Sequence, residues 1–371
     1  MVGSMNETIY MPVGEVCSSI SDTYREKKNM VTLINTSDVL EGRVLNHERV
    51  PNSNLKGQFK KTFQRDDILY SEIRPQNRRF AYVDFSPIDY IASTKLMVIR
   101  AKKDVVSPKY LYYFLKNSST VAELQLLAET RSGTFPQITF SEVANLTIPV
   151  PPLAVQEVIV QTMQCLEDKT ICNEQINDNL QQQAQAIYSS MFIDNPDPAW
   201  SHGHLSDLIT VKYGKDHKKL ADGIYPVYGS GGIMRYVERP LYNKESVLIP
   251  RKGTLNNVMY VNQPFWSVDT MFYTEMKLPN VAKFVYHFVK AKDLASMNAG
   301  SAVPSMTTDI LNAMEVVIPS ASALEEFESL VAPMYEAMEA NDVQSKALSQ
   351  MRDALLPKLM SGEIDVSDIQ L

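Results

Sequence analysis

The sequence predicts an α+β protein in which two duplicated α/β domains are separated by a pair of long antiparallel coiled-coil helices with pseudo-twofold symmetry. The first observation is a repeat: the segment TRSGTFPQITFSEVANLTIPVPP, Thr130–Pro152, returns in diverged form as NAGSAVPSMTTDILNAMEVVIP, Asn298–Pro319. Pro136 and Pro304 are 168 positions apart, and this offset holds to the end of both segments. A long heptad pattern follows each copy, and strand-like and aromatic segments precede each copy. The chain is therefore predicted to be a tandem duplication.

The duplication divides the chain into four predicted parts. They are a first globular domain over residues 1–152, a first spacer helix over 153–193, a second globular domain over 194–320, and a second spacer helix with a C-terminal tail over 321–371. Of the 371 residues, 44% are hydrophobic, which is enough apolar material for two cores of ordinary domain size.

Charge is distributed unevenly among these parts. The formal net charge is −7, but the two globular parts carry +3 and +1, whereas the two helical parts carry −4 and −7. Contact with DNA phosphates requires lysine and arginine, so any nucleic-acid binding is predicted for the globular parts. The acidic helices are expected to serve another purpose.

Localisation and redox state are predicted from what the sequence lacks. The N-terminal residues MVGSMNETIY contain neither a basic region nor an apolar stretch, and no run of about 18 apolar residues occurs, so a cytoplasmic protein is expected. Cys17, Cys165 and Cys172 form no CxxC pair. This pattern favours reduced thiols that serve as small buried residues over a disulfide framework or a zinc site.

The two predicted helices share one heptad seam. It starts at Gln156, alternates steps of three and four residues, and reappears 168 positions later, apolar at both ends and polar in the middle. Each helix is predicted to span roughly 35 to 40 residues, or about 55–60 Å. The apolar seam positions predicted to pair the helices are Ile159, Met163, Leu166, Leu180, Ile187, Leu324, Phe327, Leu348 and Leu355.

Each long amphipathic helix needs a partner for its apolar stripe, and the other helix is the obvious one. In an antiparallel pair, Asn173 and Asn177 would face Asn341 and Ser345, and such buried amides specify register. The alternative is two separate helices, each folded onto its own domain, with the polar centre solvated. Pro333 is expected to bend the second helix or to mark its start.

The globular parts are predicted to be mixed α/β. DDILYSEIRP, Asp66–Pro75, and ESVLIPRKGT, Glu245–Thr254, align as short strands that run into basic loops. KYLYYFL from Lys109 and KFVYHFV from Lys283 align as aromatic-rich helical turns. The offset between copies falls from 179 to 174 to 168, so the second copy is shorter by loop deletions. Loops that differ on a repeated scaffold are expected when two copies recognise different things.

Several motifs argue against catalysis, and no cofactor or metal is predicted. NPDP, Asn195–Pro198, lacks the spacing of an adenine methyltransferase motif and is interpreted as a turn-rich linker. YGSGG, Tyr228–Gly232, lacks the GK[ST] of a phosphate-binding loop and is interpreted as a flexible loop. His202 and His204 have no further histidine or cysteine nearby and are interpreted as exposed linker residues. No nucleophile, base and acid constellation is found.

Two segments resemble a known family. SGTFPQITFSEVANLTIPVPPLAVQEVI, Ser132–Ile159, and the tail LSQMRDALLPKLMSGEIDV, Leu348–Val366, are similar to the specificity subunits of type I restriction-modification enzymes. The resemblance covers nearly the whole chain as two target-recognition domains and two spacer helices. The second copy departs from the pattern, because IPSASALEEF, Ile318–Phe327, lacks the double proline and the glutamine of VPPLAVQEVI.

The resemblance implies a non-catalytic subunit that binds double-stranded DNA. In this family each target-recognition domain reads one half of a bipartite target, and the paired helices set the gap between the halves. Modification (methyltransferase) subunits bind the helices and, through them, the restriction/translocase subunit joins the complex. The alternative function is a dimeric scaffold or adaptor whose repeated domains bind protein and never contact DNA.

The residues best suited to contact DNA lie on the two basic loops that follow the aligned strands. Arginine and lysine hold phosphates, arginine reads guanine, and asparagine or glutamine reads adenine. The predicted DNA-binding residues are Arg74, Gln76, Asn77, Arg78 and Arg79 in the first domain and Arg251, Lys252, Thr254, Asn256 and Asn257 in the second. Further candidates are Lys60, Lys61, Arg131, Tyr228 and Arg235.

Overall fold

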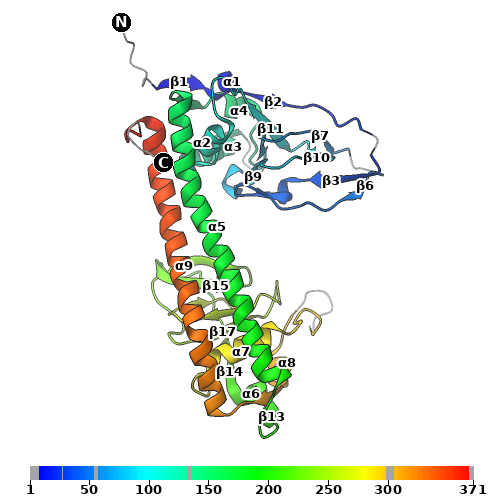
Figure 1. Ribbon diagram of the computed structural model, residues 1–371, viewed down its shortest axis with the longest axis vertical. Helices are drawn as coiled ribbons and strands as arrows, with labels where there is room; N and C mark the ends of the chain where they lie inside the picture. Colours follow the sequence, from blue (N-terminus) through cyan, green and yellow to red (C-terminus); the bar gives the residue numbers. More distant parts are fainter. Residues whose placement is uncertain (1–7, 27, 54–56, 132–134, 298–304, 367–371) are drawn as a thin grey trace. The chain divides into compact units, whose positions relative to one another are not determined.

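The computed structural model describes residues 8–26, 28–53, 57–131, 135–297 and 305–366, and it divides into two compact units (Figure 1). Unit 1 comprises Met1–Cys172 and Val343–Leu371, and unit 2 comprises Asn173–Asp342. Each unit therefore combines one globular part with portions of both long helices.

Unit 1 is built on a four-stranded sheet whose two inner strands are largely buried and apolar. Its order is β2 (Cys17–Ile20), β11 (Leu96–Ala101), β8 (Ile68–Ser71) and β9 (Phe80–Tyr82), all antiparallel. Every residue of β8 is buried. Such a continuous apolar run forms a strand that is covered on both faces.

A second four-stranded sheet, two two-stranded pairs and several short helices complete unit 1. The second four-stranded sheet has the order β6 (Val50–Pro51), β3 (Met30–Ile34), β10 (Tyr90–Ser93) and β7 (Phe59–Lys61). The two-stranded pairs are β1 (Ile9–Pro12) with β12 (Thr147–Val150), and β4 (Val39–Leu40) with β5 (Arg43–Val44). The helices are α1 (Val13–Val16), α2 (Pro108–Lys116), α3 (Ser118–Arg131) and α4 (Phe140–Ala144), with 3₁₀ turns η1 (Thr36–Asp38) and η2 (Pro75–Asn77).

Unit 2 repeats this architecture. Its main sheet is β14 (Ile209–Tyr213), β20 (Met271–Met276), β17 (Ser246–Pro250) and β18 (Met259–Val261), and its second sheet is β16 (Gly232–Val237), β15 (Asp222–Gly229) and β19 (Trp266–Ser267). β13 (Ser201–His204) pairs with β21 (Glu315–Ile318). The helices are α6 (Leu205–Leu208), α7 (Ala282–Lys290) and α8 (Thr308–Asn312).

The two units share strand order but differ at one sheet edge. The main sheets β2-β11-β8-β9 and β14-β20-β17-β18 correspond strand for strand, and each unit has one parallel strand pair, β3 with β10 and β15 with β19. Beside that pair, unit 1 places β6 after a long connection, whereas unit 2 places β16 directly after β15 in a tight hairpin. The scaffold is therefore kept, and the copies differ at this edge, which precedes β8 and β17 and so lies outside the segments over which the offset falls from 179 to 168.

The two long helices are α5 (Leu153–Ser189), which ends in a π-helical turn (Ser190–Asp194), and α9 (Ala321–Ser361). In unit 1 the N-terminal part of α5 packs against the C-terminal part of α9, with Ile159, Met163, Leu356 and Leu359 in one core cluster. Unit 2 has the reverse arrangement, in which Tyr188 near the end of α5 joins residues from the start of α9. The helices are thus paired antiparallel within each unit, as predicted.

The predicted pairing positions differ in burial. Ile159, Met163, Leu324 and Phe327 are buried, and Leu166, Leu180, Ile187, Leu348 and Leu355 are half-buried. The half-buried positions include Leu180 and Leu348 beside the polar centre, where the helices rely less on apolar contact. None of the helices in the described part of the chain combines the length and apolar character that crossing a membrane demands.

Pro333 neither starts nor ends the second helix. α9 begins at Ala321 and continues through both Pro333 and Pro357 to Ser361. A proline inside a helix frees the carbonyl four residues earlier, here that of Ser329 for Pro333. Both prolines are exposed, so water can satisfy the freed carbonyls without a break in the helix.

The polar centre of the helix pair is described within unit 2. The side-chain amide of Asn341 donates to Asn177 Oδ1 at 2.8 Å, and Asn177 Nδ2 donates to Asp342 Oδ1 at 2.8 Å and to the Met338 carbonyl at 3.2 Å. Asn173 Nδ2 lies 3.4 Å from the carbonyl oxygen of Asn341, its own equivalent in the repeat. Amides that meet their partners in only one alignment specify the register of the pair.

Replacing Asn177 and Asn341 together with leucine should raise the free energy of unfolding of unit 2 by about 1 kcal/mol, because an apolar pair replaces a half-buried polar one. Asn341→Leu alone should be less stable than the double variant, since Asn177 Oδ1 then loses its donor. Urea unfolding followed by tryptophan fluorescence measures both, because Trp200 and Trp266 lie in unit 2. A double variant less stable than the single one would contradict this account.

Candidate nucleic-acid interface

The repeated sequence segment anchors the predicted DNA-binding loop in both units. In unit 1 the Ile138 N–H donates to the Glu72 carbonyl at 2.9 Å, and Ile73 forms an isolated bridge with Gln137. In unit 2 the equivalent Met306 N–H donates to the Arg251 carbonyl at 2.9 Å, and Lys252 forms an isolated bridge with Ser305. The segment is thus repeated because each copy must hold the start of a loop that follows β8 or β17.

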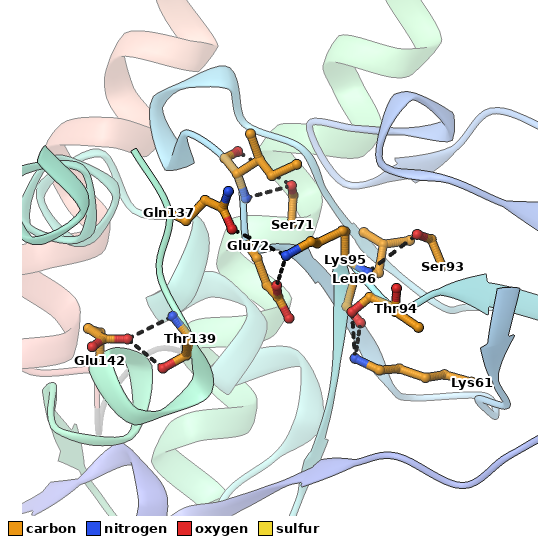
Figure 2. A network of polar contacts seen from close by, with 11 residues as sticks. Lys61, Ser71, Glu72, Ser93, Thr94, Lys95, Leu96, Gln137, Thr139 and Glu142 are labelled. Atoms are coloured by element: carbon orange, nitrogen blue, oxygen red, sulfur yellow. Dashed lines mark hydrogen bonds and ion pairs between the residues drawn. The ribbon is translucent and has the colours of Figure 1, made fainter. Parts of the chain in front are cut away.

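The threonine of each repeat caps the short helix that follows. Thr139 forms a capping box with Glu142 at the start of α4, and Thr307 Oγ1 accepts from the Ile310 N–H at α8. Figure 2 shows this cap beside a second network in unit 1, in which the Lys95 ammonium lies 3.3 Å from the Glu72 carboxylate and 3.2 Å from Gln137 Oε1. These contacts fasten the turn between β10 and β11 to the start of the loop.

Lys61, one of the further candidates for DNA contact, is hydrogen-bonded to the same turn (Figure 2). Its ammonium group donates to the carbonyls of Thr94 at 3.1 Å and Leu96 at 2.8 Å. Burial lowers the pKa of Lys61. This side chain is therefore committed to the fold, and Arg131 is likewise ion-paired with Glu142.

In the loop of unit 1, three of the five predicted residues are exposed: Arg74, Gln76 and Asn77. The loop contains the 3₁₀ turn η2, and the residues flanking it, Arg74 with φ 44° and Arg78 with φ 51°, have left-handed backbone conformations. Non-glycine residues adopt this conformation infrequently, and such strain is concentrated at functional sites. The Arg74 guanidinium lies over the ring of Phe135, 5.8 Å from its centroid.

Arg78 and Arg79 are half-buried and bonded within unit 1. Arg78 Nη2 donates to Ser118 Oγ at 2.9 Å, and Arg79 Nη1 donates to the carbonyls of Ser37 at 3.0 Å and Val39 at 3.4 Å. Arg79 therefore orders the β4–β5 region, which reduces its capacity to bind phosphate. Residue type alone could not distinguish this bonded arginine from the exposed Arg74.

The loop of unit 2 also divides into exposed and bonded residues. Lys252, Thr254 and Asn256 are exposed, and Asn256 Nδ2 donates to Asp293 Oδ1 at 3.0 Å. Arg251 is half-buried, with its guanidinium over the ring of Tyr213 at 5.3 Å. Asn257 Nδ2 donates to the Ser230 carbonyl at 2.8 Å, so its amide supports the neighbouring hairpin.

Sequence reasoning missed a second basic segment in unit 2. Lys215, Lys218 and Lys219 follow β14 and are exposed. The backbone of Lys215 is bonded to the Ser267 carbonyl at 2.8 Å, and Arg251 N–H is bonded to the Thr270 carbonyl at 2.9 Å, so both basic segments adjoin β19 and β20. The lysine cluster in GKDHKK, residues 214–219, was a detectable signal.

Three other interpretations of short motifs need correction. YGSGG is not a flexible loop but the tip of the β15–β16 hairpin, and His202 and His204 lie on strand β13, not in a linker. Cys17 is buried as expected, but Cys165 and Cys172 are exposed on α5. Within the described residues, no three acidic, histidine or cysteine side chains are grouped so that they could hold a metal ion.

A scaffold that is present twice, with one basic loop anchored by the same backbone contacts in each copy, defines a tandem duplication of one domain. Comparison with known proteins specifies the class: the sequence model described as "Type I restriction modification DNA specificity domain" matches residues 9–182 and 199–326. The chain belongs to this family. The resemblance seen in the sequence and the predicted fold class are thereby confirmed.

The relatives and solved structures agree with this family. The chain is 27% identical to the type I restriction enzyme HindI specificity subunit of Haemophilus influenzae, covering 90% of this chain and 94% of that protein. It is 24% identical to the MjaIX specificity subunit of Methanocaldococcus jannaschii, covering 76% and 77%. The type I restriction-modification system S subunit from M. genitalium superposes with a TM-score of 0.55 at 17% identity, over 99% of both chains. Specificity subunits are non-catalytic, so the prediction that this chain is not an enzyme holds.

Proposed function

We propose that this chain reads a bipartite DNA target, with one half-site recognised by the loops of each unit. The observation that carries the proposal is the paired anchoring of the two loops: Ile138 to Glu72 in unit 1 and Met306 to Arg251 in unit 2. The anchoring backbone hydrogen bonds are alike in the two units, whereas the residues that the loops carry differ in type. Identical support for different side chains is what two readers of different sequences need.

The long helices are proposed to bind the modification subunits of a type I complex and, through them, the restriction subunit. The helical parts carry net charges of −4 and −7, which disfavours contact with phosphate. In unit 1, Val343 and Met351 on α9 are exposed apolar residues. Exposed apolar side chains on an acidic surface suit a protein partner better than DNA. Methylation and restriction would then be performed by those partners at sites that this chain selects.

Alanine replacement in one loop should weaken recognition of one half-site only. Arg74→Ala with Gln76→Ala in unit 1, and Lys252→Ala with Thr254→Ala in unit 2, each remove exposed side chains that the fold does not use. Each pair of substitutions is expected to lower the affinity of the assembled complex by roughly tenfold or more. The loss should concern duplexes in which the half-site read by the altered unit is intact. Competition binding at fixed salt, with duplexes mutated in one half at a time, measures the effect.

Lys290→Ala on α7 is the matched control, because it removes an exposed cation outside both loops and outside the long helices. It should leave the affinity for DNA unchanged. Loss of recognition of the same half-site by both loop variants would contradict the division between units. A complex that binds no duplex at all would favour the alternative, a scaffold whose repeated domains bind protein.

A further inference from the structure

The tip of the β15–β16 hairpin in unit 2 is rich in glycine and carries few side-chain atoms. Gly229 pairs with Gly232 across the two tip residues Ser230 and Gly231. Gly232 has φ +109°, which side-chain-bearing residues rarely adopt. A Cβ atom at Gly231 or Gly232 would meet no atom within 4 Å. The glycines therefore leave exposed backbone that a ligand could approach closely.

The tip is fastened to the basic loop of the same unit. Asn257 Nδ2 donates to the Ser230 carbonyl at 2.8 Å. On the other side, Ser230 Oγ lies only 2.6 Å from the position of a Cβ atom at Gly253, so this approach requires glycine there. The hairpin tip and the loop that carries Lys252 and Thr254 thus form one continuous surface.

Two adjacent apolar side chains are exposed next to this tip. Ile233 is 49% exposed and Met234 is 61% exposed. Successive residues of a strand point to opposite faces, so exposure of both means that the end of the hairpin projects from the unit. The Met234 thioether lies over Gly229, close to where a Cβ atom would be. Exposed apolar residues beside basic ones mark a contact surface.

Among the described residues, only unit 2 has this hairpin surface. In the described part of unit 1, the corresponding strand β3 pairs with β6 across the long connection from Asn35 to Arg49. The two units share the main sheet and the loop anchor but not this hairpin. A feature that distinguishes two copies of one scaffold is suited to distinguishing their targets.

We propose that Ile233 and Met234 contact base edges of the DNA half-site that unit 2 reads. The inference rests on the proposed function. The exposed Lys252 lies on the attached loop, whereas Arg235, next in the strand, is bonded to Asp222 at 2.7 Å and to the Leu220 carbonyl at 3.0 Å. A phosphate bound by Lys252 would place the duplex against the tip, and apolar side chains recognise thymine methyl groups or wedge against base steps.

The test uses the full chain assembled with its modification subunits and the duplex whose sequence is established by mapping methylated sites. The double variant Ile233→Ser with Met234→Ser should bind this duplex at least tenfold more weakly and should lose discrimination at positions in one half-site only. Because no cation is removed, the slope of affinity against salt concentration should stay unchanged. Met234→Leu with Ile233→Leu should restore binding, since apolar volume is kept.

Ile224→Ser is the matched control, because Ile224 is 78% exposed on the same hairpin but at its opposite end. It should leave affinity and discrimination unchanged. Unaltered binding by the double serine variant would overturn the inference, as would impaired assembly with the modification subunits while DNA binding persists. The variant Lys252→Ala distinguishes failure of this inference from failure of the proposed function. If the wild-type complex binds the duplex and Lys252→Ala binds it more weakly, the proposed function stands whether or not the double serine variant alters binding.

Discussion

Replacing Glu167 with leucine is expected to destabilise unit 1 by about 3–5 kcal/mol, because a buried ammonium group loses its counter-ion. Glu167 on α5 forms an ion pair with Lys116 on α2, whose side chain is only 10% exposed. The same carboxylate accepts a hydrogen bond from the Tyr113 hydroxyl at 2.9 Å and lies 3.7 Å from a guanidinium nitrogen of Arg352 on α9. Urea unfolding followed by circular dichroism measures the loss. Tryptophan fluorescence provides an internal reference, because both tryptophans lie in unit 2.

The double variant Lys116→Met with Glu167→Leu should recover most of this loss, because apolar residues then replace the whole pair and only the Tyr113 hydroxyl lacks its acceptor. Burial lowers the pKa of Lys116, and loss of Glu167 should lower it further. Below the ordinary lysine pKa, about 10.4, the unfolded chain then binds more protons than the folded one, so the stability of Glu167→Leu should recover as pH rises toward that value. A single variant as stable as the double one would refute the role given to the pair.

Replacing His287 with leucine should destabilise unit 2 by about 1–3 kcal/mol, since the buried Tyr335 hydroxyl and the half-buried Gln185 amide lose their partner. His287 is fully buried on α7. Its Nδ1 lies 2.8 Å from Gln185 Oε1, and its Nε2 lies 2.9 Å from the Tyr335 hydroxyl. A carboxamide oxygen only accepts, so Nδ1 carries the proton and Nε2 accepts from Tyr335. The His287 ring is therefore neutral in the folded protein.

The pH dependence of stability should identify the same residue. Burial lowers the pKa of His287 to about 4 from the usual 6.5. Between these values the unfolded chain binds a proton that the folded chain does not, so the wild type should lose stability as pH falls from 6.5 to 4, by about 3 kcal/mol in total. His287→Leu should lack this part of the slope, and the exposed His202→Ala variant should retain it. Tryptophan fluorescence during urea unfolding at several pH values measures both, and equal slopes in all three proteins would rule out the assignment.

These two clusters occupy equivalent positions in the repeat but differ in chemistry. Tyr113 corresponds to His287 with an offset of 174, and Glu167 corresponds to Tyr335 with an offset of 168. At these two positions unit 1 has a tyrosine bonded to a carboxylate, and unit 2 has a neutral ring bonded to a phenol. Unit 2 places its ion pair elsewhere, between Lys283 on α7 and Glu328 on α9 at 2.6 Å. Alignment of the two copies identified the equivalent positions. Only the contacts showed that the two residues of each bonded pair had changed together between the copies.

The candidate site was predictable in part. Arg74, Gln76, Lys252 and Thr254 were selected by residue type after an apolar strand, and the structure leaves them exposed. Arg79 was selected by the same rule, but its donors are bonded to carbonyls about 40 residues away in the sequence. No local pattern records whether a distant carbonyl takes up an arginine donor.

Sequence alone determined what repeats and what is periodic: the 168-residue offset, the heptad seam and its polar centre, and the strands that precede each basic loop. These features depend on residues close together in the chain or on equal spacing along it. Tertiary structure alone decided that the glycine-rich tip at Ser230 joins the loop at Asn257, and that α9 continues through Pro333. Both outcomes depend on which groups are brought together and which face water, and folding settles these for segments that are distant in the sequence.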